Sequence, residues 1–169
     1  MLMKKSLLLL TLFATLFFGS SHAQTSLTVA DGMEANSYVP VYGYYADYYQ
    51  RNQVIYPASM LTDMVGSGIL SLTFYFYTAP SSNWSATFDV KLGVTSDSSF
   101  QSTAYVNVPT TTVYTGTLTK NSDNTLTVTL AEPYVYTGGN LLLEVTSQSG
   151  GNYYSAKFFG VSSSNGSIR

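Results

Sequence analysis

The chain contains no cysteine, and its single histidine, His22, lies close to the N-terminus. Without an imidazole or a thiol in the rest of the chain, neither a Ser-His-Asp relay nor a cysteine nucleophile can be assembled. Zinc sites are disfavoured as well, because their ligands are mainly His and Cys. Paired carboxylates, as in glycoside hydrolases, remain as the one catalytic arrangement that this composition readily permits.

Charged residues are also scarce. Only 9% of the chain is Asp, Glu, Lys or Arg, with 7 basic residues against 9 acidic ones. After an N-terminal lysine pair, the basic residues stand singly along the sequence. Nucleic-acid binding needs clustered cations, so that class of partner is not expected. Because no disulfide can form, packing alone must hold the core together.

The N-terminal segment has the three parts of a secretory signal peptide. A pair of lysines precedes the apolar run Leu7–Phe18, and small residues follow at Ser21 and Ala23. The run is shorter than the roughly 20 residues that a membrane-spanning helix needs. We therefore expect a signal peptide over residues 1–23, with a mature chain that is secreted or displayed at the cell surface and has no membrane span.

Residues 24–169 are predicted to form a single β-domain. Apolar residues alternate with polar residues or tyrosine along several segments, which is typical of strands with one buried and one solvent-facing side. The strands predicted are Leu27–Ala30, Arg51–Tyr56, Leu70–Tyr77, Phe88–Thr95, Thr112–Thr119, Thr125–Leu130, Leu141–Val145 and Tyr153–Val161. The predicted core consists of Leu72, Phe74, Phe76, Phe88, Val90, Leu92, Leu126, Val128, Leu130 and Leu142.

The spacing of these segments predicts the architecture. About nine short strands separated by turn residues indicate an all-β fold, a two-sheet antiparallel sandwich of the jelly-roll kind. The consecutive apolar residues of Leu141–Val145 indicate a mid-sheet strand that is covered on most sides. Tyr56–Leu61 is expected to form one helical turn. The long polar connection Ser96–Thr111 is interpreted as a crossover between sheets, with a functional loop as the alternative.

Three stretches of the sequence resemble a known module. They are Asn36–Leu61 (NSYVPVYGYYADYYQRNQVIYPASML), Ile69–Tyr75 (ILSLTFY) and Glu132–Leu143 (EPYVYTGGNLLL). In this order they resemble a β-sandwich module of secreted surface proteins from anaerobic gut- and mouth-dwelling Gram-negative bacteria. The resemblance implies a non-catalytic domain of a larger surface protein, often beside adhesion domains. It transfers no catalytic residue to this chain.

The C-terminal residues raise the question of a missing strand. Ser162–Ser167 predicts a turn that leads only to Ile168 and Arg169. In the modules that the chain resembles, a further strand follows. We therefore expect either a C-terminally truncated piece of a longer protein or a domain that lacks its final strand. An unfilled strand position would recruit a strand from a partner or from a second copy of the chain.

Aromatic residues are the strongest candidates for ligand contact. Tyr75 and Tyr77 lie on the predicted solvent face of their strand, and Trp84 follows in a turn. Tyr44 and Tyr48 belong to a second tyrosine-rich segment. Exposed aromatic planes beside hydroxyl and amide groups suit sugar rings and polypeptides. The structural alternative is that tyrosine is simply a good strand residue and that Trp84 fills an end of the sandwich.

The function expected is a non-catalytic extracellular module for adhesion or for binding carbohydrate or a host protein. The first alternative is a structural spacer between other domains of a larger surface protein. The second is a glycoside-active enzyme with paired carboxylates, which the placement of most acidic residues in turns or at solvent-facing positions disfavours. No cofactor or metal is expected, although Asp31, Glu34 or Asp97 with nearby carbonyls could bind calcium.

Overall fold

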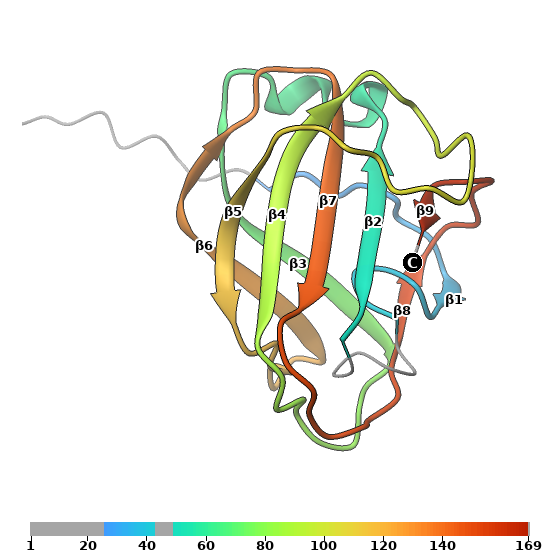
Figure 1. The fold of residues 1–169 in the computed structure, drawn as a ribbon, viewed down its shortest axis with the longest axis vertical. Coiled ribbons are helices and arrows are strands. Elements are labelled where there is room, and N and C mark those ends of the chain that lie inside the picture. Colours follow the sequence, from blue (N-terminus) through green and yellow to red (C-terminus); the bar gives the residue numbers. More distant parts are fainter. Residues whose placement is uncertain (1–25, 43–48, 169) are drawn as a thin grey trace, which may run out of the picture.

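The structure, a computed structural model, describes residues 26–42 and 49–168. Within these ranges, nine strands form two antiparallel sheets that pack face to face (Figure 1). The strands are β1 (Glu34–Asn36), β2 (Arg51–Tyr56), β3 (Gly68–Thr78), β4 (Phe88–Thr95), β5 (Thr110–Gly116), β6 (Thr125–Val135), β7 (Asn140–Ser147), β8 (Lys157–Gly160) and β9 (Ser167–Ile168).

The strand order identifies the topology. One sheet runs β1-β8-β3-β6 and the other runs β5-β4-β7-β2-β9. Strands β1 to β8 thus form the two four-stranded layers of a jelly roll, and β9 is added at the edge of the second layer. The predicted all-β antiparallel sandwich is confirmed. Helical structure in the described residues is limited to two short 3₁₀ segments, η1 (Ala58–Met60) and η2 (Thr62–Met64), and the first of these forms the predicted turn after Pro57.

The core lies between the two sheets, where alternate residues of each strand point inward. Its largest fully buried side chains include Phe76, Phe88, Leu92 and Leu126. The predicted core residues are buried as expected, with the exception of Leu72 and Phe74. These two are only half-buried, because they face a cleft that opens beside β3.

Strand β7 is buried on both faces, as its unbroken apolar sequence predicts. Leu141, Leu143 and Val145 contribute to the core between the sheets. Leu142 points to the opposite face and forms a second cluster with Ile55 and Phe100. The strand therefore lies in the middle of its sheet, between β4 and β2, with both of its sides covered.

The connection between β4 and β5 is not a crossover, so this prediction is wrong. The two strands are neighbours in the same sheet, and residues 96–109 instead fold over the outer face of that sheet (Figure 1). Phe100 packs there, and the Gln53 side chain exchanges two hydrogen bonds with the backbone of Val106, at 2.8 and 2.9 Å. A polar loop of this length can hold a position across a sheet because its few apolar residues are buried against the strands.

Several boundaries differ from the prediction. Leu27–Ala30 is irregular, and the first strand is β1 instead. A register shift between Ile69 and Ser71 in β3 buries Ile69 and leaves Leu70 42% exposed. The residues after the C-terminal turn form β9, whose pairing with β2 was not predicted. No helix in the described part of the chain is long and apolar enough to cross a membrane.

The difference in burial along β3 leads to a first prediction. Replacing Phe76 by leucine should lower the free energy of unfolding by about 1.5 kcal/mol, because the ring stacks on Phe158 in a closed part of the core. The same change at Phe74 should cost no more than about 0.5 kcal/mol, because the cleft already leaves that ring partly hydrated. Urea unfolding followed by circular dichroism would compare them, and equal losses would contradict the difference in packing.

Candidate functional site

Three aromatic side chains lie exposed on the outer side of the first sheet. Tyr75 and Tyr77 are 57% and 51% exposed, and Phe159 of β8 is 38% exposed. The Tyr77 and Phe159 rings meet edge to face with their centroids 5.3 Å apart. Strand alternation explains the placement, because Phe74 and Phe76 point to the opposite side. We refer to Tyr75, Tyr77 and Phe159 as the outer aromatic patch.

Hydroxyl and amide groups continue this face beside the outer aromatic patch. Thr125 and Thr127 of β6 lie opposite Tyr75 and Thr73 of β3. The hydroxyls of Thr73 and Thr127 are 3.2 Å apart, and the Asn121 amide donates hydrogen bonds to the hydroxyls of Thr125 and Thr127, at 3.0 and 3.2 Å. Aromatic and hydroxyl groups thus share one sheet face.

The structure agrees with the solvent-facing positions predicted for Tyr75 and Tyr77 and places Phe159 on the same face. Tyr75 and Tyr77 are exposed as expected. Phe159 was not among the predicted contacts, although its place after the inward-facing Phe158 is a signal that strand alternation provides. Asn121 could not be foreseen from local pattern, since it reaches the sheet from a turn. Tyr44 and Tyr48 lie outside the described residues.

The expected exposure of Trp84 is wrong. The indole is only 2% exposed, and its Nε1 donates a 2.7 Å hydrogen bond to the carbonyl oxygen of Tyr154. Its ring centroid lies 6.4 Å from that of Phe76. The turn that carries Trp84 folds it inward because burial of this large apolar ring is favourable once its N–H has a partner. The structural alternative, that Trp84 fills part of the sandwich, is confirmed.

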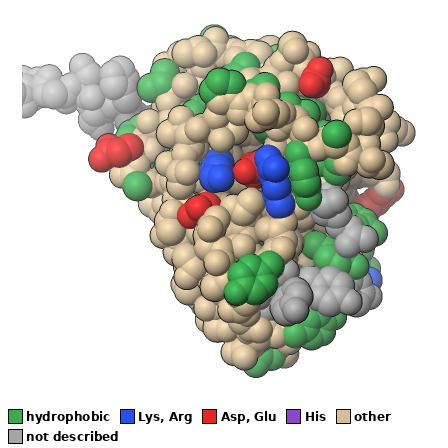
Figure 2. Space-filling view, viewed as in Figure 1, with side chains coloured by type: hydrophobic (Ala, Val, Ile, Leu, Met, Phe, Trp, Pro, Cys, Tyr) green, Lys and Arg blue, Asp and Glu red, His purple; other side chains and the backbone are tan. Residues whose placement is uncertain are grey.

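A second polar group of residues occupies the outer face of the other sheet. Figure 2 shows two basic side chains flanking an acidic one near the middle of this face. Glu144 of β7 accepts hydrogen bonds from Nε and Nη2 of Arg51, at 2.9 and 2.6 Å, and from the Gln53 amide at 2.7 Å. Lys91 lies 3.4 Å from its other oxygen. The Arg51 guanidinium also stacks 4.2 Å from the ring centroid of Tyr105.

The charges and hydrogen bonds around Glu144 indicate that this residue has a structural role. Burial raises the pKa of Glu144, but hydrogen bonds from Arg51 and Gln53 and the charges of Arg51 and Lys91 outweigh it, so the pKa is lowered overall. Glu144 is therefore a stable carboxylate at neutral pH. A general acid for glycoside hydrolysis needs the opposite, a raised pKa, so Glu144 does not resemble the acid member of a catalytic pair.

The acidic residues considered for calcium are not part of a larger acidic cluster among the described residues. Within residues 26–42 and 49–168, no group of three or more acidic or histidine side chains is placed to hold a metal ion. Glu34 instead accepts a hydrogen bond from the Ser162 hydroxyl. The backbone N–H of Asp97 donates to the hydroxyl of Thr95 at 3.1 Å, as in a tight turn.

No family model, no curated protein and no solved structure matches this chain. Its function is therefore inferred from its own residues and their geometry.

Proposed function

We propose that this protein is a non-catalytic, secreted or surface-displayed module that binds carbohydrate through the outer aromatic patch. The observation that carries this proposal is the exposure of Tyr75, Tyr77 and Phe159 on one sheet face, next to the exposed side chains of Thr73 and Thr127. Scattered exposed apolar residues are ordinary, but neighbouring exposed rings on one face indicate an interaction surface.

The chemistry of the patch suits a polysaccharide. The apolar face of a sugar ring stacks on an aromatic plane, while its hydroxyls exchange hydrogen bonds with side chains such as Thr127 and Asn121. A sheet face offers an open platform, on which successive sugar units of an extended chain can lie. Small-molecule sites, in contrast, are concave and enclose most of their ligand.

We also propose that the protein is exported and that it belongs to a larger surface protein, as the sequence predicts. The apolar N-terminal segment supports export, and the resemblance to surface modules supports a place beside other domains of a larger protein, with an adhesive role. The polar residues around Glu144 stabilise the sheet and offer no paired acid and base. A single module would bind weakly, and several copies on one cell would supply avidity.

The proposal predicts that changing both Tyr75 and Tyr77 to alanine weakens binding of any glycan found on an array by at least about tenfold, because two stacking planes are lost. Surface burial is small at both positions, so thermal stability should change little. Titration calorimetry with the selected glycan would measure the loss. Tyr153→Ala is the matched control, since Tyr153 is 53% exposed but lies in the loop between β7 and β8.

Two results would contradict this function. If no glycan binds the protein on the array, the spacer alternative gains support. If a glycan binds but the double variant retains its affinity, the site lies elsewhere on the molecule, and the tyrosine-rich segment that contains Tyr44 and Tyr48 becomes the next candidate.

A further inference from the structure

The two edges of β3 are paired to very different extents. On one edge, β6 pairs with β3 from Gly68 to Tyr75. On the other edge, β8 pairs only with Phe76 and Thr78. Among the described residues, Ile69–Tyr75 therefore has a strand on one side only. The jelly-roll position between β3 and β1 is filled by β8 at one end and is left open along the rest of its length.

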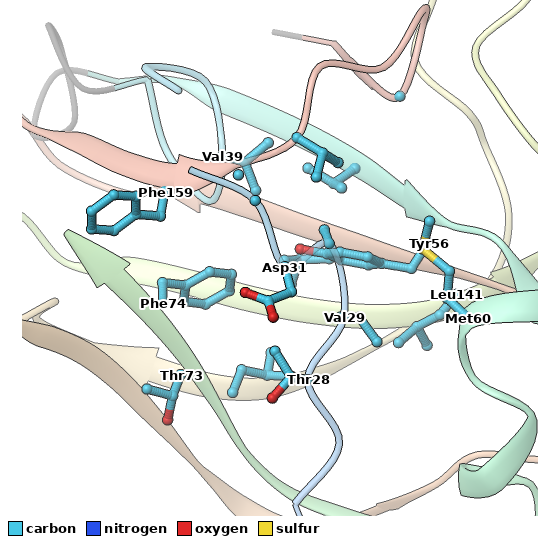
Figure 3. A pocket seen from close by; sticks show the side chains of 18 of the residues that line it. Thr28, Val29, Asp31, Val39, Tyr56, Met60, Thr73, Phe74, Leu141 and Phe159 are labelled. Carbon is cyan, nitrogen blue, oxygen red and sulfur yellow. The ribbon is translucent and has the colours of Figure 1, made fainter. Parts of the chain in front are cut away.

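A cleft of about 1860 Å³ lies beside this open edge and reaches between the two sheets. Phe74 of β3 lines one side of it, and Tyr56 and Leu141 of the other sheet line the opposite side (Figure 3). Leu72, two residues before Phe74 in β3, also lines the cleft. The volume exceeds the roughly 300–1,000 Å³ of typical small-molecule sites. The cleft therefore suits an extended chain better than a compact ligand.

The N-terminal segment that crosses this cleft does not add a strand to the sheet that contains β3. Ser26–Met33 passes over it, with Thr28, Val29 and Asp31 near its mouth (Figure 3). These residues form no strand, and no backbone hydrogen bond connects them to another described residue. The backbone groups on the open edge of β3 are thus not satisfied by this segment, and an edge of this kind is a template for another strand.

The charges around the cleft restrict what can enter. Among the residues that the structure describes, its lining includes Asp31, Glu34 and Asp123 and no lysine or arginine. The Tyr56 hydroxyl makes no hydrogen bond to another described residue, so a donor or acceptor from an incoming backbone could pair with it. Charge complementarity therefore favours a segment that has no acidic residue and carries basic residues at its ends.

From these observations we infer that the open edge of β3 accepts a β-strand from another protein, in addition to the glycan-binding role proposed above. The partner segment is an extended stretch of about seven residues, which matches the length of Ile69–Tyr75. Its alternate side chains are apolar and enter the cleft against Leu72 and Phe74, its backbone pairs with β3, and its flanking residues are basic.

A direct test uses the purified protein and a designed peptide, acetyl-Lys-Val-Thr-Val-Thr-Val-Thr-Lys-amide, labelled for fluorescence anisotropy. The matched control peptide has proline in place of the central valine, which removes one backbone donor and obstructs pairing. We expect the control peptide to bind at least about tenfold more weakly. Replacing both lysines by glutamate should also weaken binding, because the cleft is acidic.

Hydrogen exchange on the unchanged protein provides a second readout that needs no variant. Saturation with the peptide should slow exchange of the amides of Ile69–Tyr75 that point away from β6 by at least about tenfold, while β4, which is paired on both edges, should change little. For a variant test, Phe74→Ser should weaken peptide binding, and Tyr153→Ser, a change at an exposed residue that does not line the cleft, should leave it unaltered. Circular dichroism would confirm that both variants are folded.

Three results would overturn the inference. The first is equal binding of the designed peptide and its proline control. The second is strong protection, in the free protein, of the amides of Ile69–Tyr75 that point away from β6, which would show that this edge is already covered. The third is concentration-dependent dimerisation with the same protection, which would make a second copy of the chain the occupant. None of these depends on whether the outer aromatic patch binds a glycan.

Discussion

Replacing Trp84 by alanine should lower the free energy of unfolding by about 3–5 kcal/mol. The indole is one of the largest fully buried side chains, and its removal leaves a cavity beside Phe76. The carbonyl oxygen of Tyr154 also loses its hydrogen-bond donor. Urea unfolding followed by circular dichroism measures the change, because Trp84 is the only tryptophan of the chain and its fluorescence disappears with it.

Two comparisons make this prediction specific. Trp84→Phe keeps most of the ring and should cost less than the alanine change, with the lost hydrogen bond as its main contribution. Tyr75→Ala removes an exposed ring and should remain within about 0.5 kcal/mol of the unchanged protein. If Trp84→Ala behaved like Tyr75→Ala, the indole would be a surface group, and its role as a ligand contact would have to be considered again.

Changing Arg51 to methionine should lower the free energy of unfolding by about 3 kcal/mol at neutral pH. The change keeps the apolar part of the side chain but removes the guanidinium that donates two hydrogen bonds to Glu144. Glu144 is then a buried carboxylate whose remaining partners are Gln53 and the more distant Lys91. Arg51 is exposed at 41% but Glu144 at only 6%, so losing the guanidinium leaves a buried carboxylate that keeps its desolvation penalty.

The lowered pKa of Glu144 also predicts how the stability of the protein changes with pH. Because the pKa of Glu144 is lowered below the value of 4.5 that it has when unfolded, the folded state binds its proton less readily than the unfolded state. Its contribution to stability is present above pH 4.5 and is lost as the pH falls through the folded pKa. The deficit of Arg51→Met should therefore be largest at neutral pH and should shrink below pH 4.5, where a protonated Glu144 no longer needs a cation.

Chemical unfolding at several pH values would test both statements. Lys120→Met is the control for lost positive charge, since Lys120 is exposed and forms no ion pair among the described residues. The free energy of unfolding of Lys120→Met should differ only slightly from that of the unchanged protein, and this difference should vary little with pH. A deficit of Arg51→Met that stayed constant down to pH 3 would mean that lost packing on Tyr105, rather than the charge of Glu144, causes the destabilisation.

The sequence by itself determined most of the strands and the class of fold. The bounds predicted for β2 and β4 agree with the structure, and β7 is covered on both faces as its apolar run indicates. These features are readable because the alternation of apolar and polar residues is a local property, which depends only on the two-residue repeat of a strand. The exposed positions of Tyr75 and Tyr77 follow from the same repeat.

Tertiary structure decided the features that depend on which strands meet. Arg51 and Glu144 lie 93 residues apart in the sequence and meet only because β2 pairs with β7. The register shift in β3 exchanged the sides of Ile69 and Leu70, and the packing of the sheets drew Trp84 inward. The open edge of β3 is of the same kind, since it exists only because the pairing of β8 with β3 ends at Phe158. These contacts, registers and edges depend on the free energy of burying and pairing residues from distant segments. A local sequence pattern does not contain that information.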